Sequence, residues 1–131
     1  MSAPRNETIH LALGEHERRQ DGELEIHELT LRVPPELRWF RGHFPDNPVL
    51  PAVVQLQEVL RLTASIWPEL IAPRRITNGK FRRPIHPADS LRLRLERAGE
   101  AGTVRFTYSR GSETCSSGVF EFVPPEGSRG E

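Results

Sequence analysis

The histidine at position 43 is the side chain best suited to acid–base chemistry. It lies in the stretch GHFPDNPVLPAVVQLQE, residues 42–58, where Pro45, Pro48 and Pro51 follow it at intervals of three. Each proline fixes its own φ and keeps the residue before it out of the α region, so this loop is stiff. An imidazole titrates near neutrality and can move a proton at physiological pH. The residue types alone allow two interpretations, a general acid or base and a loop histidine hydrogen-bonded to backbone.

A helix is predicted to begin directly after this loop. Pro51 suits the first turn of a helix, and apolar residues recur at helical spacing from position 52 to about 67. The N–H groups of Ala52 and Val53 would then belong to the unpaired donors at the positive end of the helix, where they can polarise a carbonyl oxygen. Every helix has such an end, so this one gains meaning only because His43 is close in sequence.

Gln57 and Glu58 form a polar pair on this predicted helix. Gln57 falls on an apolar strip with Val53 and Leu60, whereas Glu58 falls on the polar stripe, one turn from Arg61. Neighbouring residues on a helix point about 100° apart, so only one of the two can face a given pocket. An amide on an apolar strip must find hydrogen bonds. Glu58 has a simple interpretation as a solvated carboxylate paired with Arg61.

The other residues suited to chemistry show no recognised spacing. The remaining histidines lack the HxH or HxxxH spacing of metal ligands: His10, His16, His27 and His86. The sequence also lacks a glycine-rich phosphate loop and a GxSxG elbow. We therefore expect no metal site and no cofactor.

Length and composition indicate one ordinary globular domain. The chain has 131 residues, of which 36% are hydrophobic and 27% are charged. We expect a single domain over residues 1–131, with an ordered core at about 9–123 and tails at 1–8 and 124–131. The sequence has no apolar run long enough to span a membrane and no apolar leader, and Cys115 is its one cysteine. These features favour a cytoplasmic location.

Basic residues are concentrated in one part of the chain. Between residues 72 and 97 there are eight arginines and lysines and two acidic residues. Such a patch can bind nucleic acid, an acidic protein or a phosphate-bearing ligand. Nucleic-acid binding is disfavoured because no aromatic residues are interleaved with the arginines.

The surrounding pattern predicts an α+β fold, a curved antiparallel sheet wrapped around one long central helix. Alternation predicts strands at 24–33, 91–96, 104–110 and 116–123, with further candidates at 9–18 and 79–84. The alternation slips between Glu28 and Leu29, which predicts a bulge in that strand. The apolar arc of the helix is wide, so more than half of the helix should be buried.

Two blocks of this sequence resemble a known family. FRGHFPDNPVLPAVVQLQE is similar to the GHFPxxPVxPGVxxxE signature of the FabA/FabZ-type (3R)-hydroxyacyl-ACP dehydratases, and KFRRPIHPADSLRL is similar to their KFxxPVxPGDxL block. The resemblance covers roughly residues 22–123 and extends, less specifically, to the ApeI-like dehydratases. It implies a hotdog fold, a homodimer with the active site at its interface, and removal of water from a β-hydroxyacyl thioester carried by acyl carrier protein.

The resemblance also implies roles for individual residues. His43 would remove the α-proton, and the Ala52 N–H would bind the thioester carbonyl at the position of a family glycine. The family acid corresponds to Gln57, which would come from the partner subunit. Further contacts are expected in two groups, with substrate at Phe44, Pro51, Ala52 and Val53, and with the carrier protein at Arg74, Arg75, Arg82 and Arg83.

Gln57 departs from the family pattern because an amide cannot give up a proton at neutral pH. Three interpretations follow. Gln57 orients the hydroxyl or a water while His43 transfers the protons; a small offset of the helix brings Glu58 to the site; or the protein binds acyl chains without turning them over. A hotdog thioesterase ranks lower, because those enzymes usually lack the HFP loop.

Overall fold

The computed structural model describes residues 8–40 and 48–123. Two predicted site residues, His43 and Phe44, lie outside the described residues, as do nearly all of the two predicted tails. The described chain forms one α-helix, one short 3-10 helix and six strands, in the order β1 Ala12–Asp21, β2 Leu24–Arg32, η1 Arg38–Phe40, α1 Ala52–Ile66, β3 Pro73–Phe81, β4 Ser90–Ala98, β5 Thr103–Arg110 and β6 Glu113–Phe122.

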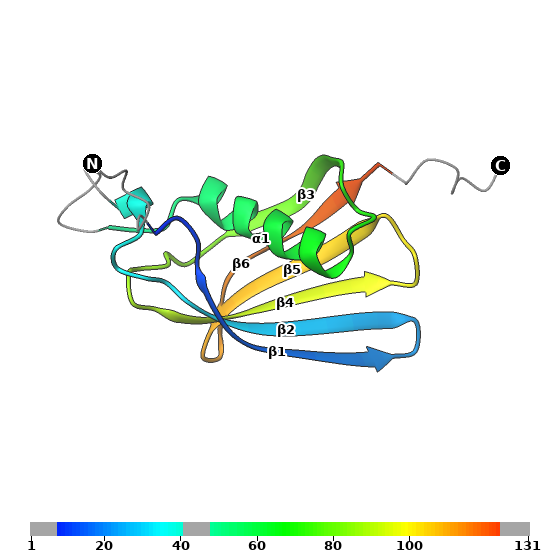
Figure 1. The fold of residues 1–131 in the computed structure, drawn as a ribbon, viewed down its shortest axis with the longest axis horizontal. Helices are drawn as coiled ribbons and strands as arrows, with labels where there is room; N and C mark the ends of the chain where they lie inside the picture. Colours follow the sequence, from blue (N-terminus) through cyan, green and yellow to red (C-terminus); the bar gives the residue numbers. More distant parts are fainter. Residues whose placement is uncertain (1–7, 41–47, 124–131) are drawn as a thin grey trace, which may run out of the picture.

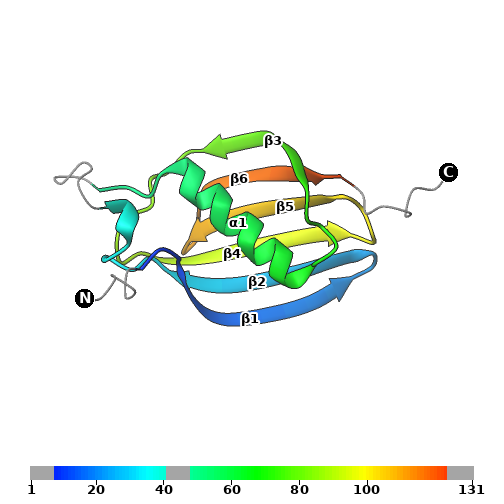
Figure 2. The ribbon, with the colours of Figure 1, turned by 45° about the horizontal axis from the view of Figure 1, so that its top comes forward.

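The six strands form one antiparallel sheet in the order β1-β2-β4-β5-β6-β3. Helix α1 lies across one face of this sheet, as Figures 1 and 2 show from two directions. The turn signal at residues 20–23 joins β1 to β2, and Gly22 there has a φ of 62°, which glycine adopts without strain. The predicted α+β hotdog arrangement is confirmed.

Alternation along the central strands places the core between the sheet and α1. In β4, Leu91, Leu93 and Leu95 are buried and Arg92 is exposed. The buried leucines join aromatic side chains of β5 and the buried face of the helix in one cluster. Each fully buried leucine contributes roughly 1.5–3 kcal/mol relative to an exposed one. This packing fixes which face of α1 turns towards the sheet.

The bulge predicted in β2 is wrong. The pairing of β2 with β4 runs without a shift, and the irregularity lies in β1 between Leu13 and His16. The alternation slips because His27 occupies a position on the helix-facing side of β2, whereas Ile26 is buried on the opposite side. A polar residue facing inward and an apolar one facing outward imitate a change of phase in a regular strand.

Helix α1 is less buried than its wide apolar arc predicts. Six of its 15 residues are buried: Val54, Gln55, Glu58, Val59, Leu62 and Thr63. Val53 is 59% exposed, and Ala64 is exposed as well. Part of the apolar arc therefore faces away from the sheet of its own chain.

Within residues 8–40 and 48–123, no helix combines the length and the apolar character that crossing a membrane requires.

Candidate active site

The start of α1 has the geometry that the sequence predicts. Pro51 is the N-cap residue in an extended conformation, and its carbonyl accepts hydrogen bonds from the N–H groups of Val54 at 3.0 Å and Gln55 at 3.1 Å. Ala52 is the first residue of the helix and is exposed. Its N–H and that of Val53 precede the first intrahelical donors, so they lie at the positive end of the helix dipole. This end can bind a carbonyl oxygen that gains negative charge.

Gln57 and Glu58 differ in exposure, but Glu58 is not the solvated residue that the sequence predicts. Gln57 is exposed, whereas Glu58 is only 3% exposed. The interpretation of Glu58 as a surface carboxylate is therefore wrong, although its predicted ion pair with Arg61 is present, with Oε1 2.8 Å from Nη2. Gln57 lies on the same exposed side of the helix as Val53 and does not need a buried hydrogen-bond partner.

Glu58 is buried because the N-terminal segment covers it. The Nδ1 atom of His10 lies 2.8 Å from Oε2 of Glu58, and the N–H of Leu11 donates to Oε1 at 3.1 Å. The same segment reaches the η1 turn, where the N–H of Arg38 donates to the carbonyl of Thr8 at 2.8 Å. The Glu58 carboxylate is thus engaged on both oxygens. An offset of the helix that would free it for catalysis requires these bonds to break.

The buried amide on α1 is that of Gln55, which the sequence reasoning missed. Gln55 is 4% exposed and hydrogen-bonds to Ser116 of β6 and to the carbonyl of Leu50. The hydroxyl of Tyr108 donates to the main-chain carbonyl of Gln55, and burial raises the pKa of this phenol. The signal in the sequence was a glutamine among apolar residues, but Gln55 and Gln57 share it, and only the packing distinguishes them.

The basic region between residues 72 and 97 is divided among different surfaces. Arg97 is 4% exposed and pairs with Glu69, so it belongs to the interior. Arg92 and Arg94 both contact Glu28 across the face of the sheet that α1 does not cover. The four arginines predicted to bind a carrier protein remain exposed on β3 and just beyond it, at Arg74, Arg75, Arg82 and Arg83. The continuous patch that the sequence suggested is therefore smaller.

A second polar cluster lies near the C-terminal end of α1. His16 Nε2 lies 2.7 Å from His27 Nδ1, and His27 Nε2 lies 2.7 Å from Glu25 Oε2. The hydrogen bond from His27, together with those from Trp67 and Arg18, lowers the pKa of Glu25 to about 2. Partial burial and the neighbouring His27 lower the pKa of His16. This chain of side chains fastens the edge strand β1 to β2.

The folded protein should lose stability as the pH falls below neutrality, in part through His16. A histidine whose pKa is lowered in the folded state binds fewer protons there than in the unfolded chain, so its contribution is complete above pH 6.5 and is lost as the pH falls through the lowered value. We expect the free energy of unfolding in urea to fall as the pH drops below about 6.5, and His16→Gln to reduce this fall. The variant His86→Gln serves as a control for general histidine effects. An unchanged pH dependence in His16→Gln would contradict the assignment.

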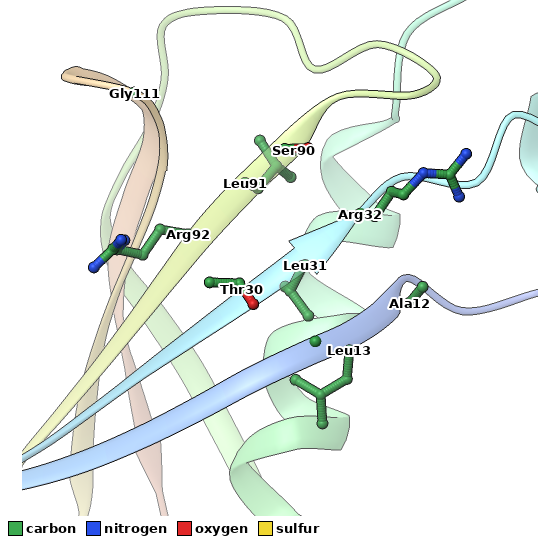
Figure 3. Close-up of a pocket in the computed structure, with 10 residues that line it drawn as sticks. Ala12, Leu13, Thr30, Leu31, Arg32, Ser90, Leu91, Arg92 and Gly111 are labelled. Carbon is green, nitrogen blue, oxygen red and sulfur yellow. The ribbon is translucent and has the colours of Figure 1, made fainter.

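A hollow of about 520 Å³ lies where β1, β2 and β4 meet the β5–β6 turn. Leu13, Leu31 and Leu91 are among its lining residues. The guanidinium groups of Arg32 and Arg92 point away from each other (Figure 3). A ligand site requires polar groups that converge. We therefore place the candidate site at the start of α1. Within the part of the chain that the structure describes, no group of three or more His, Cys, Asp or Glu side chains could hold a metal ion.

Comparison with known families gives one match that covers most of the chain. The family model ApeI-like, described as ApeI dehydratase, matches residues 16–119. The FabZ 3-hydroxyacyl-[acyl-carrier-protein] dehydratase of Rhodospirillum rubrum is 28% identical over 95 residues, which are 66% of this chain and 57% of that protein. The FabZ of Acidiphilium cryptum is 31% identical over 75 residues, or 50% of this chain and 46% of that protein. The chain therefore spans about half the length of these curated relatives.

Solved structures agree with the fold. An uncharacterised protein from Erwinia carotovora subsp. atroseptica superposes with a TM-score of 0.79 at 31% identity, over 88% of this chain and 98% of that one. The dehydratase heterocomplex ApeI:P from Xenorhabdus doucetiae gives a TM-score of 0.67 at 28% identity, over 82% of this chain and 95% of the other. A dehydratase domain of a mycocerosic acid synthase-like polyketide synthase, at 21% identity and a TM-score of 0.58, shares the fold.

Proposed function

Because the chain belongs to the ApeI-like dehydratase family, we propose that it removes water from a β-hydroxyacyl thioester to give a trans-2-enoyl thioester. A base takes the proton from the α-carbon, the electron pair forms the new double bond, and the β-hydroxyl leaves with a proton as water. The observation that carries the proposal is the family match over residues 16–119, which includes the exposed start of α1. The proposed setting is fatty-acid or aryl-polyene-type lipid synthesis.

We assign the proton transfers to His43 and the binding of the thioester carbonyl to the Ala52 N–H. Charge develops on that carbonyl oxygen when the α-proton leaves, so a fixed donor at a helix end favours the transition state. Alanine in place of glycine keeps the N–H group. Phe44, Pro51 and Val53 would contact the acyl group beside it, and the exposure of Val53 on α1 is compatible with that role.

Gln57 is the better candidate of the polar pair for the position of the family acid. Its side chain is exposed on α1, on the side that the chain's own sheet does not cover. The Glu58 carboxylate is occupied by His10, Leu11 and Arg61. We therefore propose that Gln57 orients the leaving hydroxyl or a water by hydrogen bonding, while His43 carries the proton.

The exposed strip of α1 favours a second subunit beside the helix. Val53 is 59% exposed, Ala64 is exposed, and Leu56 and Leu60 are half-buried between them. An apolar strip of this kind marks an interaction surface. The related ApeI:P structure is a dehydratase heterocomplex, in which chains associate. We propose that two copies of this chain pair along α1, so that Gln57 of one protomer reaches the site of its partner.

We expect the protein to sediment as a dimer at micromolar concentration, and Ala64→Asp to shift it to the monomer. A carboxylate placed on this strip would lose its hydration in the dimer without gaining a partner. Ser65→Asp is the matched control, because Ser65 is also exposed but lies about 100° further around the helix. Dimers of equal stability in both variants, or a wild-type monomer, would contradict pairing along this strip, and a wild-type monomer would favour a different partner chain.

The exposed arginines on and after β3 suit an acidic carrier protein. Arg75 pairs with Glu121 at 2.7 Å, and Arg83 lies 3.8 Å from Glu113. Within the described residues, Arg74 and Arg82 form no ion pair, so their charge is available to a partner. Electrostatic complementarity of this kind raises association rates and weakens with salt. We propose these four arginines as the docking surface for acyl carrier protein.

The direct test is the elimination reaction itself. The purified protein is incubated with a 3-hydroxyacyl thioester, either on acyl carrier protein or on pantetheine, and the enoyl thioester is followed by its ultraviolet absorbance and by mass. We expect turnover of both, with a higher kcat/KM for the carrier-borne substrate at low salt. Absence of turnover would overturn the proposed reaction, and saturable binding without turnover would support an acyl-binding subunit instead.

The variant Gln57→Glu tests whether the amide at position 57 limits the rate of elimination. If the site uses a side chain at position 57 to assist the departing hydroxyl, restoring a carboxyl group should raise kcat, by roughly 10²-fold for a positioned acid. The variant Gln57→Met is the matched control, because it keeps the length of the side chain and removes its hydrogen bonds. A kcat unchanged in both variants would show that position 57 does not face the reacting hydroxyl.

A further inference from the structure

Gln55 is a buried amide on α1 whose side chain ties the helix to the sheet. It is 4% exposed, and its Oε1 accepts a hydrogen bond of 2.7 Å from the hydroxyl of Ser116, which is itself 1% exposed. Its Nε2 donates to the carbonyl of Leu50 at 3.1 Å. The hydroxyl of Tyr108 donates to the main-chain carbonyl of Gln55 at 2.8 Å. With the bond from its own N–H to the Pro51 carbonyl, four hydrogen bonds therefore converge on this residue in the first turn of the helix.

These bonds fix the junction at which the helix begins. The carbonyl of Leu50 is held by Gln55 Nε2, and the N–H of Leu50 donates to the carbonyl of Ile85 at 2.7 Å. Pro51 follows with φ fixed by its ring and caps the helix through its carbonyl. The peptide groups on both sides of Leu50 are thus held by the rest of the chain, and the next N–H along the helix is that of Ala52.

If packing were the only role of this side chain, an apolar residue would stabilise the fold more than an amide does. Burying an amide requires that both of its polar atoms find partners, whereas an apolar side chain of similar volume packs against the same neighbours without that cost. The position lies among buried apolar residues, with Val54 and Val59 on the same face of the helix. What Gln55 adds is direction, because it sets where the Leu50 carbonyl points.

We propose that Gln55, supported by Ser116, is a positioning residue that aims the N–H at the start of α1 at the carbonyl of the acyl thioester. This inference rests on the proposed dehydratase function. Gln55 does not touch the substrate. It acts through Leu50 and Pro51, so that the Ala52 N–H is already oriented before the substrate arrives. A donor held in this way does not have to reorganise when charge develops on the oxygen.

The first experiment compares Gln55→Met with Val59→Ala. Methionine keeps the length of the side chain and removes both hydrogen bonds, while Val59→Ala loosens the same buried face of α1 without touching the junction. We expect Gln55→Met to lower kcat about tenfold or more with KM within about twofold, because a misplaced group far from the chemistry costs up to about 10²-fold. Val59→Ala should lose stability and keep kcat. If Gln55→Met and Val59→Ala lose the same kcat at the same loss of stability, the positioning role is overturned.

A second measurement reports on the oriented donor without any reaction. The probe is a saturated acyl pantetheine thioester that carries ¹³C at its carbonyl and has no β-hydroxyl to eliminate. In the wild type, the bound carbonyl stretch should shift to lower frequency relative to the free thioester, and Gln55→Met should lose most of that shift. The same frequency in wild type and variant would overturn the inference, even if the enzyme turns over substrate.

The pair Gln55 and Ser116 should act as one unit. Ser116→Ala removes the hydroxyl that holds the amide, so it should lower kcat in the same direction, and the double variant should lose no more than Gln55→Met alone. Additive losses would contradict a shared role. If the wild type shows no turnover but still polarises the bound carbonyl, the proposed reaction fails and the positioning role stands. If it neither reacts nor polarises the carbonyl, both fail.

Discussion

Replacing His43 by alanine is expected to reduce the elimination of water by roughly 10²–10⁴-fold, the usual contribution of a positioned acid or base. The expectation rests on the loop GHFPDNPVLP, in which three prolines follow the histidine and lead to the start of α1. With Gln57 in the position of the family acid, His43 is the one side chain assigned here that can accept and return a proton near neutrality. Its loss should lower kcat with little effect on KM.

The control for this variant is His86→Ala. His86 is also a histidine in a loop close to a proline, and its side chain is 40% exposed, with Nδ1 3.9 Å from Asp89. It should retain the wild-type rate. A His43→Ala protein that is folded, dimeric and as active as the wild type would rule out His43 as the base. A loss of equal size in His86→Ala would indicate a general effect on folding.

Replacing Glu58 by alanine is expected to destabilise the protein by about 1–3 kcal/mol, the cost of leaving a buried donor unpaired. The carboxylate is 3% exposed and accepts the N–H of Leu11 at 3.1 Å, while His10 Nδ1 lies 2.8 Å from its other oxygen. Arg61 and His10 are partly exposed, so water can take over their hydrogen bonds. The N–H of Leu11 is buried and has no such replacement, which makes it the main source of the loss.

Glu58→Gln and Glu121→Ala are the comparison variants for the stability loss of Glu58→Ala. Glutamine keeps an oxygen for the Leu11 N–H, so Glu58→Gln should lose less than Glu58→Ala. Glu121 pairs with the exposed Arg75 at the sheet, and such surface ion pairs are worth about 0–1 kcal/mol. The free energies of unfolding from urea titrations are compared at one pH. If Glu58→Ala and Glu121→Ala unfold with the same free energy, the buried carboxylate does not hold the N-terminal segment.

Most elements of the fold were predictable because their signals are local, although the strand expected at residues 79–84 is β3 at Pro73–Phe81. The alternation of Leu91, Leu93 and Leu95 with arginines indicates a half-buried strand, and this pattern is decided by immediate neighbours in the sequence. Helix α1 was predicted to within a residue of its observed end at Ile66 for the same reason. The resemblance to the dehydratases then implied the hotdog arrangement, whereas the strand order came from the structure.

The environment of the polar residues on α1 was not predictable, because distant segments decide it. Glu58 stands on the polar stripe of the helix, and only residues 10 and 11, 47 or more positions earlier, turn it into a buried carboxylate. Gln55 and Gln57 carry the same side chain two positions apart, and Ser116 distinguishes them from 61 residues away. Helical periodicity reports the direction of a side chain, whereas its partner depends on long-range packing.

The contact between His10 and Glu58 also bears on the order in which the chain folds. The two residues are 48 positions apart, and among the described residues before Ala12 the pairing is limited to an isolated bridge between Thr8 and Leu37. Closing so long a loop costs entropy that is recovered only when both ends are already in place. We therefore expect the amides of residues 8–11 to gain protection from hydrogen exchange after those of β4 and β5, and to lose it first. The N-terminal segment would be the last part of the domain to dock and the easiest to release.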